Sequence, residues 1–320
     1  MGRDDLIVAG GTSQIQRVIK IIARDVLEQL PAGRLRNTVE YQEAAHVGSG
    51  TVQKAFQMLE QAGAATTRAR GHQGRFVASR DLGRLWVLAG MPQVRALLTP
   101  PGAVEVYGMA AGLSAEFTRL GVPLRIEYLR GARNRVAEAA TGVSFAVVSK
   151  GLAAIAPDPS FEYITMKPWT YYARGSIVLL TAARFERQHP GAFRIGIDKE
   201  SDDHLQLTNA EFSEPGHQFV HCPFPQVPTE ILRGTIDAGI WHQMLLLIPP
   251  SVVGLVQRPL GTAAAEVARN LSPAVLAFPK KSHALATVLG GISFARIARV
   301  QRQMLTSSQD PLAHYNVWHR

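Results

Sequence analysis

The chain is poor in cysteine, and this scarcity excludes several classes of protein. Only Cys222 is present among 320 residues, so neither an intrachain disulfide framework nor a zinc site with the usual set of cysteine ligands can form. A single cysteine fits a reducing compartment. The first residues, MGRDDLIVAGGTSQIQ, carry early acidic charge and a short apolar stretch, which is unlike a secretory signal. We therefore expect a cytoplasmic protein.

Long uncharged segments are also scarce. The longest, residues 238–257 (AGIWHQMLLLIPPSVVGLVQ), has the length of a membrane span but contains His242, Gln243 and the pair Pro249 and Pro250. Proline lacks an amide hydrogen and interrupts a helix. We expect a buried strand, a turn and a second strand here, and no contact with a membrane.

The motifs of several enzyme classes are missing. The sequence has no Gly-x-Ser-x-Gly elbow and no glycine-rich Walker loop, which hydrolases and nucleotide-binding enzymes use. Its ten histidines include no His-Glu-x-x-His pair. His221 and Cys222 are adjacent, and adjacent side chains of a strand point to opposite faces, so they cannot form a nucleophile and base pair. We predict no catalytic residues, no metal and no cofactor.

Acidic residues are fewer than basic ones, and the balance indicates an anionic partner. The chain has 34 Lys and Arg against 25 Asp and Glu, a net charge of +9. Nucleic acid, anionic lipid and an acidic small molecule all fit this excess, and charge alone does not choose among them. With 46% hydrophobic residues over this length, the chain can form two or three compact units.

Residues 1–80 show the order of elements of a winged helix-turn-helix. Apolar residues recur every three or four positions over residues 13–30, which predicts an amphipathic helix. A short helix is expected over 39–45 and a third over 51–62, ended by Gly63 as C-cap. Two short strands then flank a basic, glycine-rich loop at residues 68–75. Helix, helix, turn, helix and hairpin predict a DNA-binding domain.

The third helix and the hairpin supply the residues for DNA recognition. Residues 47–80 contain five basic residues and one acidic residue. Short polar side chains at the start of a helix can reach base edges in the major groove, while cations hold the phosphates of a double-stranded operator. The predicted DNA-binding residues are Ser49, Thr51, Gln53, Lys54, Arg68, Arg70, His72 and Arg75. The alternative is a solvated module that mediates dimerisation or recruits a protein partner to a ligand-binding or scaffold protein.

Residues 81–320 alternate between strand-like and helix-like segments. This order predicts parallel, doubly covered α/β sheets in two lobes. Lobe 1 is expected over about 81–155 and 270–320 and lobe 2 over about 156–269, with crossings near 152–170 and 257–275. A single larger α/β domain is the alternative. Strands are predicted at 84–92, 123–132, 143–150, 175–180 and 193–198, with helices at 102–121, up to His189, from Pro228 to Arg233, and from Ser282 to Leu305.

Polar and glycine residues gather where these strands end, and ligands of α/β sheets bind at the carboxyl ends of strands. The planar guanidinium groups of Arg130 and Arg133 match carboxylate or phosphate, so we expect a small anionic effector between the lobes. Helix capping by Ser201, ion pairs of the arginines with Glu127 or Glu138, and a core position for Trp241 are the alternatives. The predicted ligand-binding residues are Met91, Pro92, Arg130, Gly131, Arg133, Ser149, Lys150, Asp198, Ser201, Asp203, Gln206, Gln226 and Trp241.

The N-terminal segment resembles the winged helix of GntR-type regulators. The stretch LPAGRLRNTVEYQEAAHVGSGTVQKAFQMLEQAGAATTRARGHQGRFV departs from that pattern at Ser49 and Gln53, where the family has DNA-contacting arginines. An operator sequence therefore cannot be transferred. The matching positions are Pro31, Gly33, Val47, Thr51, Val52, Gly71 and Gly74.

The C-terminal part resembles the effector domain of YhfZ-type transcriptional regulators. The motifs GMP, YGMAAGL, YLRGARNRV, FAVVSK and QVPTEILRGTIDAGIW carry this resemblance, which together with the front end covers about residues 15–305. It implies a winged helix followed by a two-lobed, periplasmic-binding-protein-like domain of type 2. It also implies effector binding and a homodimer.

Overall fold

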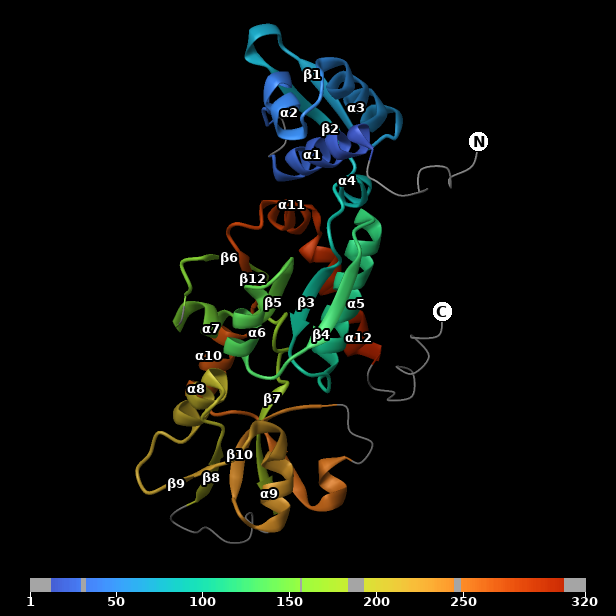
Figure 1. Cartoon of the computed structure of the whole chain (residues 1–320). Coiled ribbons are helices and arrows are strands. Elements are labelled where there is room, and N and C mark those ends of the chain that lie inside the picture. Colours follow the sequence, from blue (N-terminus) through green and yellow to red (C-terminus); the bar gives the residue numbers. More distant parts are fainter. Residues whose placement is uncertain (1–12, 30–32, 156, 184–192, 245–248, 308–320) are drawn as a thin grey trace. The chain divides into compact units, whose positions relative to one another are not determined.

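A computed structural model describes residues 13–29, 33–155, 157–183, 193–244 and 249–307 (Figure 1). These residues form two compact units. The first comprises the described residues up to Val94 together with Phe117–Leu124 and Ser282–Ile292, and the second comprises Arg95–Glu116, Arg125–Lys281 and the described residues from Ser293. The predicted helix up to His189, Pro31 of the GntR-like pattern and residues 245–248 lie outside the described residues.

The first unit contains the predicted winged helix. β1 and β2 pair antiparallel, and Arg34 forms an isolated bridge to Phe76 beside them. Figure 1 shows this hairpin next to α3. The elements are α1 (Gln14–Glu28), α2 (Thr38–Ala45), α3 (Ser49–Gln61), β1 (Ala65–Ala69), η1 (Gly71–Gln73) and β2 (Arg75–Arg80). The order of helices and strands expected from the periodicity is confirmed.

Local caps and one buried hydrogen bond define this small domain. Ser13 begins α1 with a capping box, and Gly63 follows α3 with φ +64°, the left-handed conformation expected of a helix C-terminus. The buried Tyr41 hydroxyl donates to the carboxylate of Asp25, which also accepts from the Arg36 amide at 3.2 Å. Burial and the Asp25 carboxylate raise the pKa of Tyr41 far above its usual value.

The expected strand over residues 84–92 is wrong, because this segment begins with a helix. α4 (Leu82–Leu88) starts at Asp81, whose side chain accepts from the Arg84 amide at 2.9 Å. Leu85 and Trp86 are fully buried, and Gly90 ends the turn with φ +62°. The spacing of the buried residues is therefore helical, and the first strand of the following sheet begins only at Val94.

One sheet of the second unit has the strand order β4-β3-β5-β12-β6. β3 runs parallel to β5, whereas β12 runs antiparallel to both β5 and β6. The expectation of a purely parallel sheet is thus corrected, because β12 enters from the other lobe. Its strands are β3 (Val94–Leu98), β4 (Leu124–Tyr128), β5 (Ser144–Ser149), β6 (Phe161–Thr165) and β12 (Ala274–Pro279). The helices that accompany this sheet in the sequence are α5 (Val104–Leu120), α6 (Ala132–Ala139), α7 (Lys150–Ile155) and α12 (Phe294–Ser307), whereas α11 (His283–Gly291) belongs to the first unit.

The second sheet repeats this arrangement in the order β11-β7-β10-β8-β9. β8 is parallel to β9 and β10, and β7 is antiparallel to β10 and β11. Its strands are β7 (Ile177–Ala182), β8 (Arg194–Ile197), β9 (Gln218–His221), β10 (Ala238–His242) and β11 (Leu255–Arg258). The helical elements are α8 (Asp202–Glu211), η3 (Phe224–Gln226), α9 (Val227–Arg233), η4 (Pro250–Val253) and α10 (Thr262–Leu271).

The run 238–257 contains β10 and all but the last residue of β11, in agreement with the predicted pair of strands. Among the described helices, none combines the length and apolar character that a bilayer crossing requires.

The chain passes between the two sheets twice, from β6 to β7 and from β11 through α10 to β12. The first strand after each crossing, β7 in one sheet and β12 in the other, runs antiparallel to its neighbours. Separate apolar clusters fill the lobes, one around Leu97, Val148 and Phe161 and one around Leu180, Ile231 and Trp241. Two sheets with two crossings define the predicted two-lobed architecture rather than a single larger α/β domain.

Candidate functional site

The exposed face of α3 carries the side chains predicted to read DNA. Ser49, Gln53 and Lys54 are exposed and Thr51 is half-buried. On the opposite side Val52, Ala55, Phe56 and Leu59 are buried in the domain core. The helix thus presents short polar groups and one cation near its N-terminus, as a recognition helix requires.

The basic residues of the hairpin divide into two groups. Arg68, Arg70 and His72 are exposed. The Arg70 guanidinium lies 4.9 Å from the ring centroid of Phe76 within the hairpin. The half-buried Arg75 guanidinium lies 4.4 Å from the ring centroid of Phe56 on α3 and donates to Thr67 Oγ1 at 2.7 Å. Arg75 therefore fastens the hairpin to α3, and only its remaining donors could reach a phosphate.

Arg80, the last basic residue of the segment 47–80, contacts the end of α1 and so has a structural role. Its guanidinium donates to the carbonyl oxygens of Gln29 and, at 3.1 Å, of Val26 at the end of α1. Burial lowers the pKa of Arg80. The exposed positive charge of α3 and the hairpin consequently comes from Lys54, Arg68 and Arg70.

In the second unit, two arginines of lobe 1 form ion pairs with lobe 2. Arg130 Nη2 lies 2.9 Å from Asp198 Oδ2. Arg133 forms a bidentate pair with Asp202, with distances of 3.0 Å and 2.9 Å. Gly131, between them, has φ +84° and precedes α6, a backbone conformation that favours glycine.

Asp198 is held by more than the arginine. Its side chain is 2% exposed and accepts from the amides of Phe224 at 2.8 Å and Glu200 at 3.1 Å. Burial acts to raise the pKa of Asp198, but these amides and the Arg130 guanidinium hold it below its usual value. The strand end after β8 therefore keeps a carboxylate charged and facing lobe 1.

Asp203 forms a third connection between the lobes. The hydroxyl groups of Ser149, at the end of β5, and Tyr172, in the first crossing, each donate to its carboxylate at 2.8 Å. Burial raises the pKa of Asp203 although both hydroxyl groups oppose the shift. A methyl group on Gly151 would come within 2.0 Å of Leu271 and 3.3 Å of Asp203, so the backbones approach closely at this point.

Two further buried groups at this interface were not predicted. Arg135 is 2% exposed and donates to the Val147 carbonyl at 3.1 Å and the Tyr171 hydroxyl at 2.9 Å. Glu105 lies 2.7 Å from His242 Nε2 and accepts from the Ala173 amide at 2.8 Å. Burial acts to raise the pKa of Glu105, but His242 and this amide hold it well below its usual range.

The space beside these groups is small. A cavity lined by Thr99, Glu105, Thr170 and Tyr171 among others has a volume of about 20 Å³, which is enough for a single water molecule. A metabolite therefore cannot enter at this place unless the lobes separate.

Local signals could have identified some of the missed residues. Asp202 directly precedes the predicted Asp203, and Arg135 follows Arg133 in the motif YLRGARNRV. Glu105 and His242 are 137 positions apart, and no local pattern connects them.

Other predicted ligand residues have different surroundings. Ser201 caps α8 by accepting from the His204 amide at 3.3 Å, and Gln206 Nε2 donates to the Asp202 carbonyl at 3.4 Å. Lys150 is exposed at the start of α7, and Gln226 is exposed before α9. Ser201 and Gln206 thus lie close in sequence to the ion-paired Asp202, whereas Lys150 and Gln226 are exposed on the surface.

Three predicted residues are not brought to the lobe interface. Trp241 is 2% exposed in the core of lobe 2. Met91 and Pro92 belong to the first unit, where the Pro92 carbonyl accepts from Trp86 Nε1 at 2.9 Å. Because residues 82–88 form a helix rather than a strand, Met91 and Pro92 do not stand at the carboxyl end of a strand. Over the described part of the chain, no three His, Cys, Asp or Glu side chains could jointly hold a metal ion.

The fold and these contacts define a winged helix-turn-helix protein with a two-lobed, periplasmic-binding-protein-like domain. Residues 32–77 match the family model of a helix-turn-helix domain. Residues 81–312, more than half of the chain, match the model of the YhfZ C-terminal domain. The chain belongs to the YhfZ C-terminal domain family.

The chain is also similar to individual proteins. YhfZ of Escherichia coli (strain K12) is 27% identical over 235 residues, which are 70% of this chain and 73% of that protein. The crystal structure of YhfZ from Shigella flexneri matches with a TM-score of 0.55 and 22% identity, covering 72% of this chain and 97% of that one. The periplasmic aliphatic sulphonate binding protein SsuA from Escherichia coli has a TM-score of 0.48 at 13% identity, over 69% of this chain and 77% of its own.

Proposed function

We propose that this protein is a DNA-binding transcriptional regulator whose operator affinity is controlled by a small anionic metabolite bound between the two lobes. The proposal assigns DNA binding to residues 1–80 and effector binding to 81–320. Lobe 1 would comprise about 81–155 and 270–320, and lobe 2 about 156–269. The family models, which match 32–77 and 81–312, support this division. The protein acts in the cytoplasm as a homodimer and catalyses no reaction.

The observation that carries DNA binding is the exposed positive charge on a recognition helix and its adjoining hairpin. Lys54 on α3 and Arg68 and Arg70 on the hairpin are exposed within one small domain. Phosphate contacts of this kind supply affinity without sequence preference, whereas Thr51 and Gln53 are placed to read bases. The regulator therefore holds the backbone with the cations and selects its operator with the start of α3.

The lobe interface supports an anionic effector. Arg133 already pairs with a carboxylate through two hydrogen bonds, the geometry that suits a planar oxyanion, and Arg130 pairs with another through one. When the lobes separate, both guanidinium groups become available to a carboxylate or phosphate of the effector. Ligand binding then selects one arrangement of the lobes, and in a dimer this changes the spacing of two DNA-binding heads.

Charge reversal tests the DNA-binding face. Lys54→Glu and Arg70→Glu should each weaken binding to every duplex, because both residues contact phosphates in the proposal. Thr51→Ala and Gln53→Ala should mainly change sequence preference. Arg299→Glu on α12, an exposed arginine of the second unit, is the control with the same change of net charge. Equal affinities of wild type, Lys54→Glu and Arg70→Glu in a gel-shift assay would refute this face and favour recruitment of a protein partner.

A thermal-shift screen of the full chain against anionic metabolites tests the effector site. The effector should raise the melting temperature of wild type and should do so much less for the double variant Arg130→Lys and Arg133→Lys, because lysine keeps the charge but loses the bidentate fork. Arg125→Lys is the control in the same lobe. A stabilising anion whose effect is unchanged in the double variant would place the effector elsewhere.

A further inference from the structure

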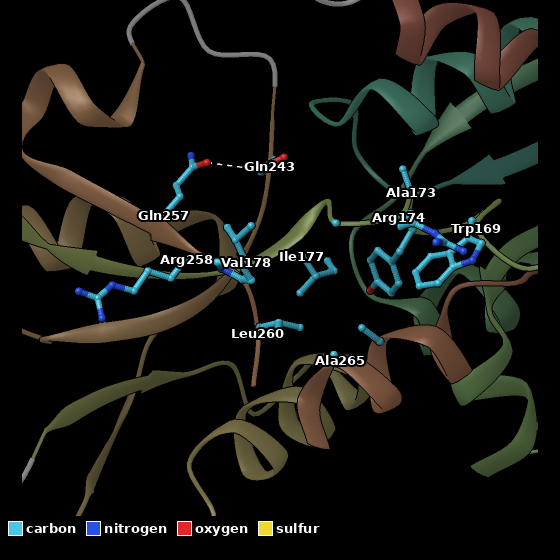
Figure 2. Close-up of a pocket in the computed structure, with 14 residues that line it drawn as sticks. Trp169, Ala173, Arg174, Ile177, Val178, Gln243, Gln257, Arg258, Leu260 and Ala265 are labelled. Carbon is cyan, nitrogen blue, oxygen red and sulfur yellow. Dashed lines mark hydrogen bonds between the residues drawn. The ribbon is translucent and has the colours of Figure 1, made fainter. Parts of the chain in front are cut away.

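A larger cavity lies at the segments that join the two lobes. Figure 2 shows its lining, and its volume is about 460 Å³. Its walls come from both connections between the lobes, from the strand ends beside them and from α10. The lining residues are Trp169, Tyr172, Ala173, Arg174 and Gly175 in the first crossing, Ile177 and Val178 at the start of β7, Gln243 after β10, Gln257 and Arg258 at the end of β11, Pro259 and Leu260 in the second crossing, and Ala265 and Ala268 on α10. This volume is within the range of small-molecule sites, and it is many times larger than the volume of the cavity beside Glu105.

The inner wall of this hinge pocket is apolar. Ile177 and Val178 are almost fully buried, and Leu260 and Trp169 are half-buried. In Figure 2 the side chains of Ile177, Leu260 and Trp169 surround the same space. Such a wall favours a compact aromatic or branched hydrocarbon body, whose burial supplies the binding energy.

A cation stands at the edge of the same pocket. Arg174 is exposed, and its guanidinium lies 5.3 Å from the ring centroid of Trp169. A guanidinium that stacks on a ring uses its face and keeps its in-plane N–H donors directed outward. At another edge Gln243 Nε2 donates to Gln257 Oε1 at 2.9 Å. Arg258 also lines the pocket, but in Figure 2 its side chain extends away from Trp169 and Arg174. The pocket therefore combines an apolar body with a cation, Arg174, at the edge beside Trp169.

The backbone at Trp169 is unusual in a way that supports a binding role. Its φ of +67° lies in the left-handed region, which bulky residues rarely adopt. Ser272 holds this conformation, because its hydroxyl accepts from the Trp169 amide at 3.1 Å and its carbonyl accepts from the amides of Thr170 and Tyr171. Strained residues persist where the surrounding structure enforces them, and they concentrate at functional sites.

We propose that the hinge pocket binds a small monocarboxylate with an aromatic or branched apolar body, whose carboxylate pairs with Arg174. This site uses none of the residues assigned to the effector between the lobes. Because its walls belong to both connections between the lobes, its occupant contacts the segments that must bend when the lobes move. The hinge pocket is a second ligand site, able to modulate the response to the first.

The test titrates the full chain with 3-phenylpropionate and with its uncharged amide, 3-phenylpropanamide. Binding is measured by calorimetry and by tryptophan emission, to which Trp169 contributes. Wild type should bind the acid about tenfold more tightly than the amide, as a charge-assisted pair predicts. Arg174→Gln should abolish that difference by weakening the acid alone. Ala265→Phe, which fills the pocket from an exposed position of α10, should abolish binding of both.

Two controls separate this site from the rest of the protein. Arg269→Gln changes an exposed arginine of α10 that does not line the pocket and should bind both probes as wild type does. The double variant Arg130→Lys and Arg133→Lys should also bind them normally, so loss of the effector response and loss of the hinge pocket are distinguishable. No binding of either probe at about 10 mM, far above the affinities of specific sites, would overturn the proposal. Binding unchanged by both Ala265→Phe and Arg174→Gln would overturn it equally.

Discussion

Replacing Lys54 by alanine is expected to reduce the salt dependence of DNA binding by a defined amount. Lys54, Arg68 and Arg70 are the exposed cations of α3 and the hairpin, and each contacts one phosphate in the proposal. Each contact contributes roughly −0.9 to the slope of log affinity against log salt on B-DNA. A dimer with three contacts in each protomer therefore has a slope of about −5, and a fourfold rise in salt weakens binding about 10³-fold.

The Lys54→Ala dimer loses two phosphate contacts, so its slope should be shallower by about 2. Fluorescence anisotropy with a labelled duplex of arbitrary sequence measures this slope, because the phosphate contacts do not depend on base sequence. Arg299→Ala removes the same charge from α12 and should leave the slope unchanged. Identical slopes for wild type and Lys54→Ala would show that Lys54 touches no phosphate, and a wild-type slope near zero would refute the interface.

Two further predictions concern buried hydrogen bonds. Tyr41→Phe removes the hydroxyl that donates to Asp25. Loss of a hydrogen bond to a carboxylate should destabilise the winged helix by about 1.5–3 kcal/mol. Hydrogen exchange of the α1 and α3 amides measures this loss, and unchanged protection would contradict it. For Asp203, burial raises the pKa despite the hydroxyl groups of Ser149 and Tyr172, so the folded state binds this proton more tightly than the unfolded chain. The stability it contributes is fully present below the unfolded pKa and is lost as pH rises through the folded pKa. Asp203→Asn should therefore be more destabilising in urea denaturation at pH 4.5 than at pH 8, and an equal or reversed difference would contradict the assignment.

The winged helix could be predicted from the sequence because the spacing of apolar residues and the capping residues at helix ends define its helices. The apolar stripe of 13–30 became α1, and Gly63 adopted the left-handed conformation after α3. The same kinds of signal were present at α4, where Asp81 is a suitable N-cap and Gly90 a suitable end. The apolar run between them was interpreted as a strand, since a short buried run does not distinguish a strand from a helix by periodicity alone.

The direction of strands and the partners of site residues followed from tertiary structure. β7 and β12 are antiparallel to their neighbours because each is reached through a crossing from the opposite lobe, and no local pattern contains that information. The rule that ligands bind at strand ends selected Arg130, Arg133 and Asp198 as candidate ligand-binding residues. It did not indicate that the arginines pair with carboxylates of lobe 2.

The sequence by itself determined the order of helices and strands in the winged helix, the position of the basic hairpin and several of the strand ends that meet between the lobes. These depend on residue spacing, capping and the chemistry of single side chains. Only the tertiary structure decided that Glu105 faces His242 across 137 positions and that Trp169 and Arg174 border a hinge pocket. Such contacts depend on how two distant segments pack, which the periodicity of neither segment specifies.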